Sequence, residues 1–393
     1  MATLGACSDN NEGPDPDDGL PVDLGKRELA NCYIVQKAGQ YRFKADNQFN
    51  LGEGLPVPPE IHPVSASLVW QSAPGLISDI ELVTTPQGEP YIWFTVEKAE
   101  GNALLAALDA DGSILWSWHI WMPRQAVESV ATATGYEVMN LNLGALDNTP
   151  GSVSSYGFLY QWGRKDPFPA SPTLTGNTST VGAPLYDMEG NPVGITNSSW
   201  YNTDCNTLEY SVANPTVVLS NYAQYSTSRD WLRTGDNSLW GNPDGEGSGR
   251  KTCYDPSPAG WRVAPADAFL NLTTTGGYAW DLDDFAVADS NGDGVISIDD
   301  YNYGWHFLVD GDSPLYFPAA ARYDGSYAML MGSVCGVWGS YWSNAPSATV
   351  KGGAMSCLSF QVTDMNGGEM ITVSPQAAGS KADAYSIRCV RDK

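Results

Sequence analysis

The sequence predicts a mainly β protein whose second part is an α+β domain. The chain contains Gly 41, Pro 26, Tyr 20 and Trp 14, a composition that favours turns and sheets over long helices. Short runs of alternating apolar and polar residues, separated by turn residues, recur in the first third of the chain. With 393 residues, 42% of them hydrophobic, the chain is long enough for two or three domains with sizeable cores.

Residues 30–122 are expected to form an immunoglobulin-like β-sandwich. Turn sequences separate candidate strands at 31–35, 40–43, 67–71, 77–83, 91–96, 103–108 and 114–120. Short strands at this density, with a turn every 8–12 residues or so, are typical of such sandwiches. Segment 114–121 is apolar on both faces, which predicts a central strand. Its tryptophans, Trp116, Trp118 and Trp121, belong either to the core, which is favoured, or to an aromatic binding platform.

The remainder of the chain has fewer regular elements. Residues 123–135 are expected to connect the two domains, and residues 136–393 to form the second one. Short helices are predicted at 156–162 and at 265–271, where Pro265 suits a first helical turn. Strands are predicted at 355–362, 370–374 and 385–390. A large domain with so few elements is expected to be held together by loop packing and aromatic residues, with disulfides or ions as further supports.

Charge argues against nucleic acid and anionic lipid as partners, and hydropathy argues against a membrane-spanning helix. The formal net charge of −25 argues against nucleic acid, whose phosphates require a basic face, and against docking on anionic lipid. The sequence contains no uninterrupted apolar stretch of about 18 residues, so no transmembrane helix is expected.

The N-terminal residues 1–29 are interpreted as the remnant of a lipoprotein signal followed by an acidic tether. The sequence before Cys7 reads Leu-Gly-Ala, which resembles a bacterial lipobox, so Cys7 is the expected lipidation site. The usual charged and hydrophobic regions of a signal peptide are missing, and the alternative is a chance cysteine in a tail. Residues 8–19 contain no apolar side chain and cannot pack into a core.

Residues 289–300 match the pattern of an EF-hand calcium loop. Calcium takes six to eight oxygen ligands, which alternate residues of a tight loop can supply. Gly294 allows the sharp turn, and the apolar Ile296 is expected to anchor the loop to the core. Aspartate at the last position resembles the dockerin-type loop and predicts a weak site, with a dissociation constant on the order of 10⁻⁵ to 10⁻³ M. The expected structural calcium ligands are Asp289, Asn291, Asp293, Val295 through its carbonyl, Ser297 and Asp300.

No catalytic motif stands out, and the chain is expected not to be an enzyme. It has no GxSxG elbow, HExxH helix or P-loop, and its three histidines, His62, His119 and His306, have no Ser or Cys partner in sequence context. Carboxylates are numerous, so an acid–base pair of the glycoside-hydrolase kind stays open as a less favoured reading.

Six segments of the second region resemble the FISUMP ("major paralogous") domain family in order. They are NLGA at 142–145, YGFLYQWGRKDPF at 156–168, YDPSPAGWRV at 254–263, FPAA at 317–320, YWS at 341–343 and SIRCVRD at 386–392. The resemblance implies a fold related to C-type-lectin-like and formylglycine-generating-enzyme-like domains. The sugar-binding triplets of C-type lectins and the cysteine arrangement of formylglycine-generating enzymes are absent, so neither activity is carried over.

The first region resembles the N-terminal domain of fimbrillin-like tip proteins, through ANCYIV at 30–35 and GSILWSWHIW at 112–121. Together the two resemblances imply a secreted cell-surface adhesin, either a type V pilus tip subunit or a related outer-membrane lipoprotein. Its expected partners are pilus subunits joined by donor-strand exchange, or ligands on a host or bacterial surface. The sequence stops just after the last expected strand, so the chain is expected to accept a strand or cap a pilus. The alternative is a free-standing lipoprotein that binds glycans or host proteins.

One departure from the family pattern concerns a disulfide. The family usually has a cysteine where Ser257 stands, and that cysteine pairs with the one in the terminal Arg-Cys-Val segment, here Cys389. The resemblance therefore implies that Cys253 takes over as the partner of Cys389.

Overall fold

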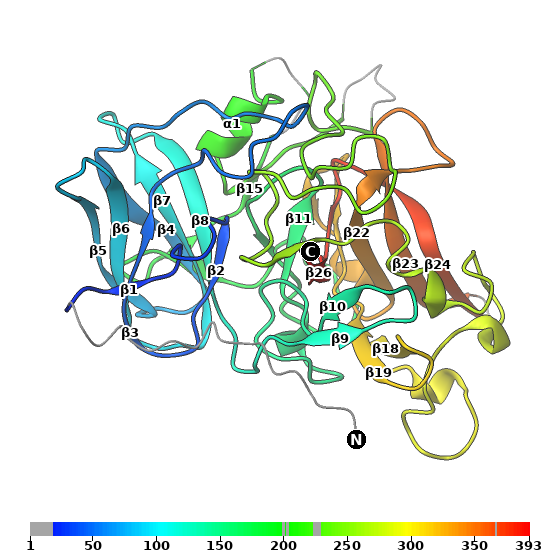
Figure 1. Ribbon diagram of the computed structural model, residues 1–393. Coiled ribbons are helices and arrows are strands. Elements are labelled where there is room, and N and C mark those ends of the chain that lie inside the picture. Colours follow the sequence, from blue (N-terminus) through cyan, green and yellow to red (C-terminus); the bar gives the residue numbers. More distant parts are fainter. Residues whose placement is uncertain (1–18, 199–200, 202–203, 223–228, 366–367) are drawn as a thin grey trace.

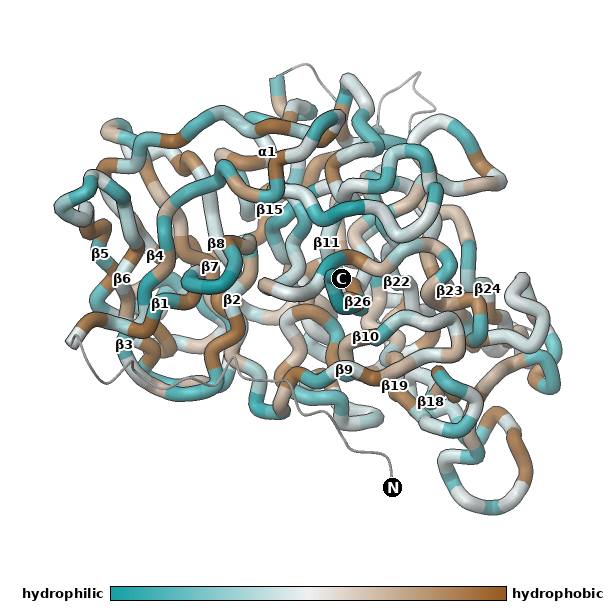
Figure 2. Tube along the Cα trace, in the orientation of Figure 1, coloured by the Kyte–Doolittle hydropathy of each residue, from teal (hydrophilic) through white to brown (hydrophobic). Residues whose placement is uncertain are grey.

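The computed structural model describes residues 19–198, 201, 204–222, 229–365 and 368–393, and it is mainly β (Figure 1). Strands account for 36% of the chain and helices for 6%, which confirms the predicted mainly-β class. Hydrophobic residues lie along the strands, whereas the connecting loops are mostly hydrophilic (Figure 2). Among the helices described, none is both long and apolar enough to cross a membrane.

Two sheets pack face to face in the first region. One sheet has the order β1-β3-β6-β5, with β1 Val22–Asp23, β3 Gly39–Lys44, β6 Pro90–Val96 and β5 Ile77–Thr84. The other has the order β14-β13-β4-β7-β8-β2, with β14 Pro192–Val193, β13 Leu185–Tyr186, β4 Ser65–Gln71, β7 Gly101–Leu108, β8 Ile114–Met122 and β2 Cys32–Ile34. The Phe43 ring of one sheet lies 5.2 Å from the Trp118 ring of the other. All seven strands predicted between residues 31 and 120 are present, with bounds that shift by one or two residues.

The second region consists of several small sheets. A four-stranded sheet contains β17 Trp261–Val263, β26 Cys389–Arg391, β10 Glu137–Met139 and β9 Ser129–Ala131. A five-stranded sheet contains β12 Phe168–Pro169, β11 Phe158–Gln161, β25 Ala384–Tyr385, β20 Tyr323–Asp324 and β21 Met329–Leu330. A three-stranded sheet contains β22 Trp338–Pro346, β23 Ala354–Met365 and β24 Gly368–Ser380. Two pairs complete the list, β15 Thr196–Asn197 with β16 Val217–Val218, and β18 Gly304–Leu308 with β19 Pro314–Pro318.

The helices described are short. They are α1 Leu208–Ala213 and the 3₁₀ turns η1 Val153–Ser155, η2 Leu270–Leu272, η3 Leu282–Asp284, η4 Ile298–Asp300 and η5 Gly332–Val334. The helix predicted at 156–162 is wrong, because β11 occupies this segment between two glycines with positive φ, Gly157 and Gly163. The helix predicted at 265–271 shrinks to η2, and the strand predicted at 385–390 is divided between β25 and β26.

Alternation and burial explain the packing of the sandwich. Ile92, Phe94 and Val96 of β6 face inward, with exposed fractions of 0%, 2% and 1%, as the alternation predicts. Trp116, Trp118 and Trp121 of β8 are buried as well, because β8 lies between β7 and β2 and both of its faces are covered. These tryptophans are therefore core residues and not an exposed platform.

The two regions share one hydrophobic core. The cluster that contains Trp118 continues without interruption to Trp162 and Trp342 of the second region. Strand β13 of the second region also extends the sandwich, since Tyr186 pairs with Gln71 of β4. In addition, β9 lies within the predicted connection 123–135, and it pairs with β10. The sequence boundary near residue 122 is thus crossed by both packing and hydrogen bonds.

Candidate functional site

An exposed aromatic pair, Tyr278 and Trp280, is the clearest candidate for a contact surface. They are 60% and 74% exposed, and Trp280 is the most exposed large hydrophobic residue among those described. The ring centroids lie 6.1 Å apart with an interplanar angle of 77°, an edge-to-face arrangement. Single exposed rings are common on protein surfaces, but two large rings in contact with each other offer a partner a continuous apolar area.

The backbone between the two rings holds them in place. Ala279 forms an isolated antiparallel bridge with Val373 of β24, with N–H to O distances of 2.8 and 3.0 Å in the two directions. The Ala279 side chain is 4% exposed and packs in the core. Since side chains alternate along an extended segment, Tyr278 and Trp280 both point outward on the same face. The rings are therefore carried on a backbone that the sheet edge holds.

Carboxylates follow directly after the aromatic pair. Asp281 caps η3 and accepts the N–H of Asp283 at 3.2 Å, and Asp283 is itself exposed. The Asp284 carboxylate accepts the Thr274 hydroxyl at 3.0 Å. In such an arrangement, the aromatic rings can cover the apolar face of a ligand, and the carboxylate oxygens can accept hydrogen bonds from its hydroxyl or amine groups.

The predicted calcium loop, residues 289–300, lies in the same part of the molecule and projects as the yellow loop beside β18 and β19 (Figure 1). Its residues 290–296 are exposed. The Asp289 carboxylate accepts the N–H groups of Gly292 and Gly294, each at 2.7 Å. Asn291 and Asp293 each accept the N–H two residues further on, at 2.9 and 2.8 Å. The side-chain oxygens of alternate residues are therefore held by N–H groups of the loop's own backbone.

Asp300 closes the loop from a buried position. Its carboxylate accepts the N–H groups of Ser290, Asn291 and Ser297 at 2.7, 3.1 and 2.9 Å. Burial acts to raise its pKa, but these N–H groups outweigh burial and hold the pKa below its ordinary value. The expectation that Ile296 anchors the loop is wrong, because that side chain is 45% exposed and Ile298 packs against the core instead.

The side chains of the loop do not form a metal-binding group in this structure. Within the described residues, no group of three or more His, Cys, Asp or Glu side chains is placed to hold a metal ion. The donor set nevertheless suits a hard cation, because the side chains of Asp289, Asn291, Asp293, Ser297 and Asp300 offer oxygen ligands.

A cavity of about 270 Å³ lies at the seam between the two regions. Ser72 and Asn102 line it from the sandwich, and Tyr156, Phe158 and Pro184 line it from the second region. The wall is mainly apolar, and the Asn102 amide that borders it is engaged, since it donates to the Gly144 carbonyl at 3.0 Å.

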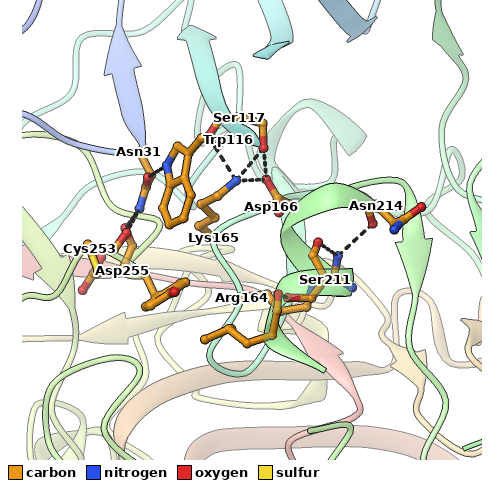
Figure 3. Close-up of polar contacts among 12 residues, drawn as sticks. Asn31, Trp116, Ser117, Arg164, Lys165, Asp166, Ser211, Asn214, Cys253 and Asp255 are labelled. Carbon is orange, nitrogen blue, oxygen red and sulfur yellow. Dashed lines mark hydrogen bonds and ion pairs between the residues drawn. The ribbon is translucent and has the colours of Figure 1, made fainter. Parts of the chain in front are cut away.

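Buried polar groups cluster between β8 and the segment that follows β11 (Figure 3). The Lys165 ammonium donates to the Ser117 carbonyl at 3.1 Å and to the Asp166 carboxylate at 2.7 Å. Ser117 donates its hydroxyl to the same carboxylate at 2.6 Å, and Trp116 covers the ammonium at 4.8 Å. Burial lowers the pKa of Lys165 in spite of the Asp166 charge. With exposed fractions of 3% and 2% for Lys165 and Asp166, the pair joins the two regions from the inside.

The structure does not bring the predicted disulfide together. Within the described residues, no two cysteines are joined by a disulfide. The Cys253 sulfur lies 3.6 Å from the Pro56 carbonyl, whereas the Cys389 sulfur contacts the Ser257 hydroxyl at 3.2 Å. The Cys253–Cys389 pairing stays a prediction, and the structure directs the two sulfurs to different groups. The predicted lipidation site, Cys7, lies outside the described residues.

Comparison with known proteins gives no relative. No family model matches the chain, and searches of curated proteins and of solved structures find no significant match. Sequence reasoning missed Tyr278 and Trp280; the available signal was the Tyr-Ala-Trp alternation just before three aspartates.

Proposed function

We propose that this chain is a surface-exposed, non-catalytic adhesion protein that contacts its ligand through Tyr278 and Trp280. The observation that carries the proposal is the exposure of both rings on a backbone held by the edge of β24. Rigid aromatic side chains provide contact area at a low cost in conformational entropy, and they dominate the energy of many interfaces.

The finer fold assignment belongs to the same proposal. The two facing sheets support an immunoglobulin-like sandwich, and the loop-rich second region with its three-stranded sheet supports a C-type-lectin-like FISUMP domain. On this reading Cys7 carries a lipid, the acidic residues that precede β1 tether the protein to the outer membrane, and the chain serves as a pilus tip subunit or a related lipoprotein. Pili probed with an antibody would separate these two, because a free-standing lipoprotein is absent from them. The predicted tether 1–29 is shorter than expected, because Val22–Asp23 pairs with β3 in the sandwich.

The aromatic pair provides a direct test of adhesion. Trp280→Ala is expected to weaken binding by about 2 kcal/mol, or about 30-fold in Kd, because the central ring of a contact patch carries much of its energy. The full chain is applied to arrays of immobilised oligosaccharides and matrix proteins, and the strongest hit is titrated with each variant.

Tyr327→Ala is the matched control, since Tyr327 is also exposed, at 64%. This variant should bind like the wild type. Equal binding by the wild type and by the Tyr278→Ala/Trp280→Ala double variant would reject the proposed contact surface.

We also propose that residues 289–300 bind calcium in a structural role. The support is the oxygen-rich set of alternate side chains on one tight loop and the closure of that loop by Asp300. The side chains of Asp289, Asn291, Asp293, Ser297 and Asp300, with the Val295 carbonyl, would hold the ion, which would draw together a loop that is otherwise exposed.

Calcium is expected to stabilise the full chain by about 2.7 kcal/mol when its concentration is 100 times the Kd. The measurement is an isothermal titration with calcium together with thermal unfolding at low and high calcium. Asp293→Ala should abolish both signals, whereas Asp283→Ala, which removes an exposed carboxylate outside the loop, should leave them intact. No heat and no shift in Tm for the wild type would refute the metal site.

A further inference from the structure

Cys32 lies at the start of the sandwich and against the second region. It is the first residue of β2, and its Cα pairs with that of His119 in β8. It also forms an isolated parallel bridge with Pro258. The side chain is 0% exposed. Through Cys32, strand β2 therefore contacts the segment that precedes β17.

Cys389 reaches the same segment from the other end of the chain. It begins β26, pairs with Val263 of β17 and is 0% exposed. Its sulfur lies 3.2 Å from the Ser257 hydroxyl, and Ser257 directly precedes Pro258. The two cysteines therefore flank one dipeptide, Ser257-Pro258.

Electrostatic effects agree with this closeness. Burial raises the pKa of the Cys32 thiol well above its ordinary value, and the charge of a Cys389 thiolate raises it further. Both cysteines also raise the pKa of the Tyr160 hydroxyl, after the larger effect of burial. Both thiols therefore lie in the same buried environment beside Tyr160.

The other buried cysteines face different surroundings. The Cys253 sulfur is directed at the Pro56 carbonyl, and the Cys357 sulfur lies 3.6 Å from the Ala377 carbonyl. The Cys335 sulfur contacts the Thr173 carbonyl at 2.8 Å. None of these contacts points toward Ser257-Pro258.

We propose that Cys32 and Cys389 form a disulfide that joins the first strand of the sandwich sheet to the last strand of the chain. The oxidant is an external disulfide. One cysteine thiolate attacks it, forming a mixed disulfide and releasing one thiol; the second cysteine then attacks the mixed disulfide, forming the Cys32–Cys389 bond and releasing the second thiol. Two protons leave the cysteines, and the two electrons pass to the external disulfide.

The bond must form before the core closes. Burial raises the pKa of Cys389 to about 12, so the folded protein holds very little of the reactive thiolate at neutral pH. Once formed, the cross-link closes a loop that runs from residue 32 to residue 389, almost the whole described chain. Such a long loop gives a disulfide its greatest effect on the unfolded state.

The experiment is refolding of the full chain in a buffer of reduced and oxidised glutathione. After denaturation, a thiol alkylating reagent should label five of the seven cysteines, because the bond consumes two, and all seven after reduction. A tryptic digest without reductant should contain the Cys32 peptide linked to the Cys389 peptide. Seven labels before reduction, or linkage of a different pair, would overturn the proposal.

Variants provide matched controls. Cys253→Ala should still give the linked peptide, whereas Cys32→Ala should give none, with all six remaining cysteines labelled. Reduction should lower the Tm of the wild type and leave that of Cys32→Ala unchanged. If Cys32→Ala does not fold, the digest of the wild type alone still decides the pairing.

Discussion

Replacement of Lys165 by methionine is expected to lower the free energy of unfolding by about 3–5 kcal/mol, because it leaves a buried carboxylate without its counter-charge. Lys165 and Asp166 are fully enclosed, and the ammonium donates to both Asp166 and Ser117 (Figure 3). After the substitution, the hydroxyl of Ser117 is the remaining side-chain donor that the structure shows for the Asp166 carboxylate. Urea denaturation of the two proteins measures the difference.

A surface ion pair supplies the control. Lys393 and Glu137 lie 2.9 Å apart, but their side chains are 66% and 37% exposed. Lys393→Met should therefore cost less than about 1 kcal/mol. The double variant Lys165→Met/Asp166→Asn should recover part of the loss, because it removes the unpaired charge. A loss below about 1 kcal/mol for Lys165→Met would contradict the view that the pair supports the joint between the two regions.

Acid is expected to destabilise the protein through His119, with a slope of about 1.4 kcal/mol per pH unit between roughly pH 6 and pH 4. His119 is 1% exposed, and burial lowers its pKa to about 3. Its Nε2 lies 2.8 Å from the Asn102 amide oxygen, and since Asn102 uses its amide group as a donor to Gly144, Nε2 carries the proton of a neutral ring.

The direction follows from the two pKa values. The folded pKa is depressed below the unfolded value of about 6.5, so the unfolded chain takes up the proton first as the pH falls. The stability contributed by neutral His119 is therefore complete above about pH 6.5 and is lost progressively down to about pH 3.

The measurement is urea denaturation at several pH values for the wild type and for His119→Gln. Because the carboxylates titrate in both proteins, the difference between the two curves isolates His119. His62→Gln is the control, since His62 is exposed and should leave the slope unchanged. Parallel curves for the wild type and His119→Gln would exclude the buried neutral histidine as a source of acid sensitivity.

The sandwich could be predicted from the sequence because its strands are long and alternate. In β6, three inward apolar residues repeat with period two, and β8 carries large apolar residues on both faces, so each strand contains its own evidence. The short strands of the second region are harder to predict from the sequence, because a strand of two to four residues such as β11 is too short to show a periodic pattern. Phe158–Gln161 is buried on both faces, and only the surrounding sheet determines that this aromatic segment is extended.

The contact surface was harder to predict than the core. A Tyr-Ala-Trp triplet has no preference for either orientation until Ala279 pairs with Val373, a residue 94 positions away. The calcium motif, in contrast, is local, because its residue spacing can be recognised in the sequence alone and its side chains bond to N–H groups of the same loop. The surroundings of the cysteines could not be predicted in this way, because the residues next to each thiol come from distant segments of the chain.

The contact between β13 and β4 bears on how such chains can be inherited. Because Tyr186 pairs with Gln71, an edge strand of the sandwich sheet comes from the second region, more than a hundred positions later in the chain than its partner. Recombination that exchanged residues 19–122 alone would bring an incomplete sheet and uncover Trp121. Residues 19–122 are therefore not expected to fold as an independent unit, because one edge of their sheet and part of their core come from later sequence.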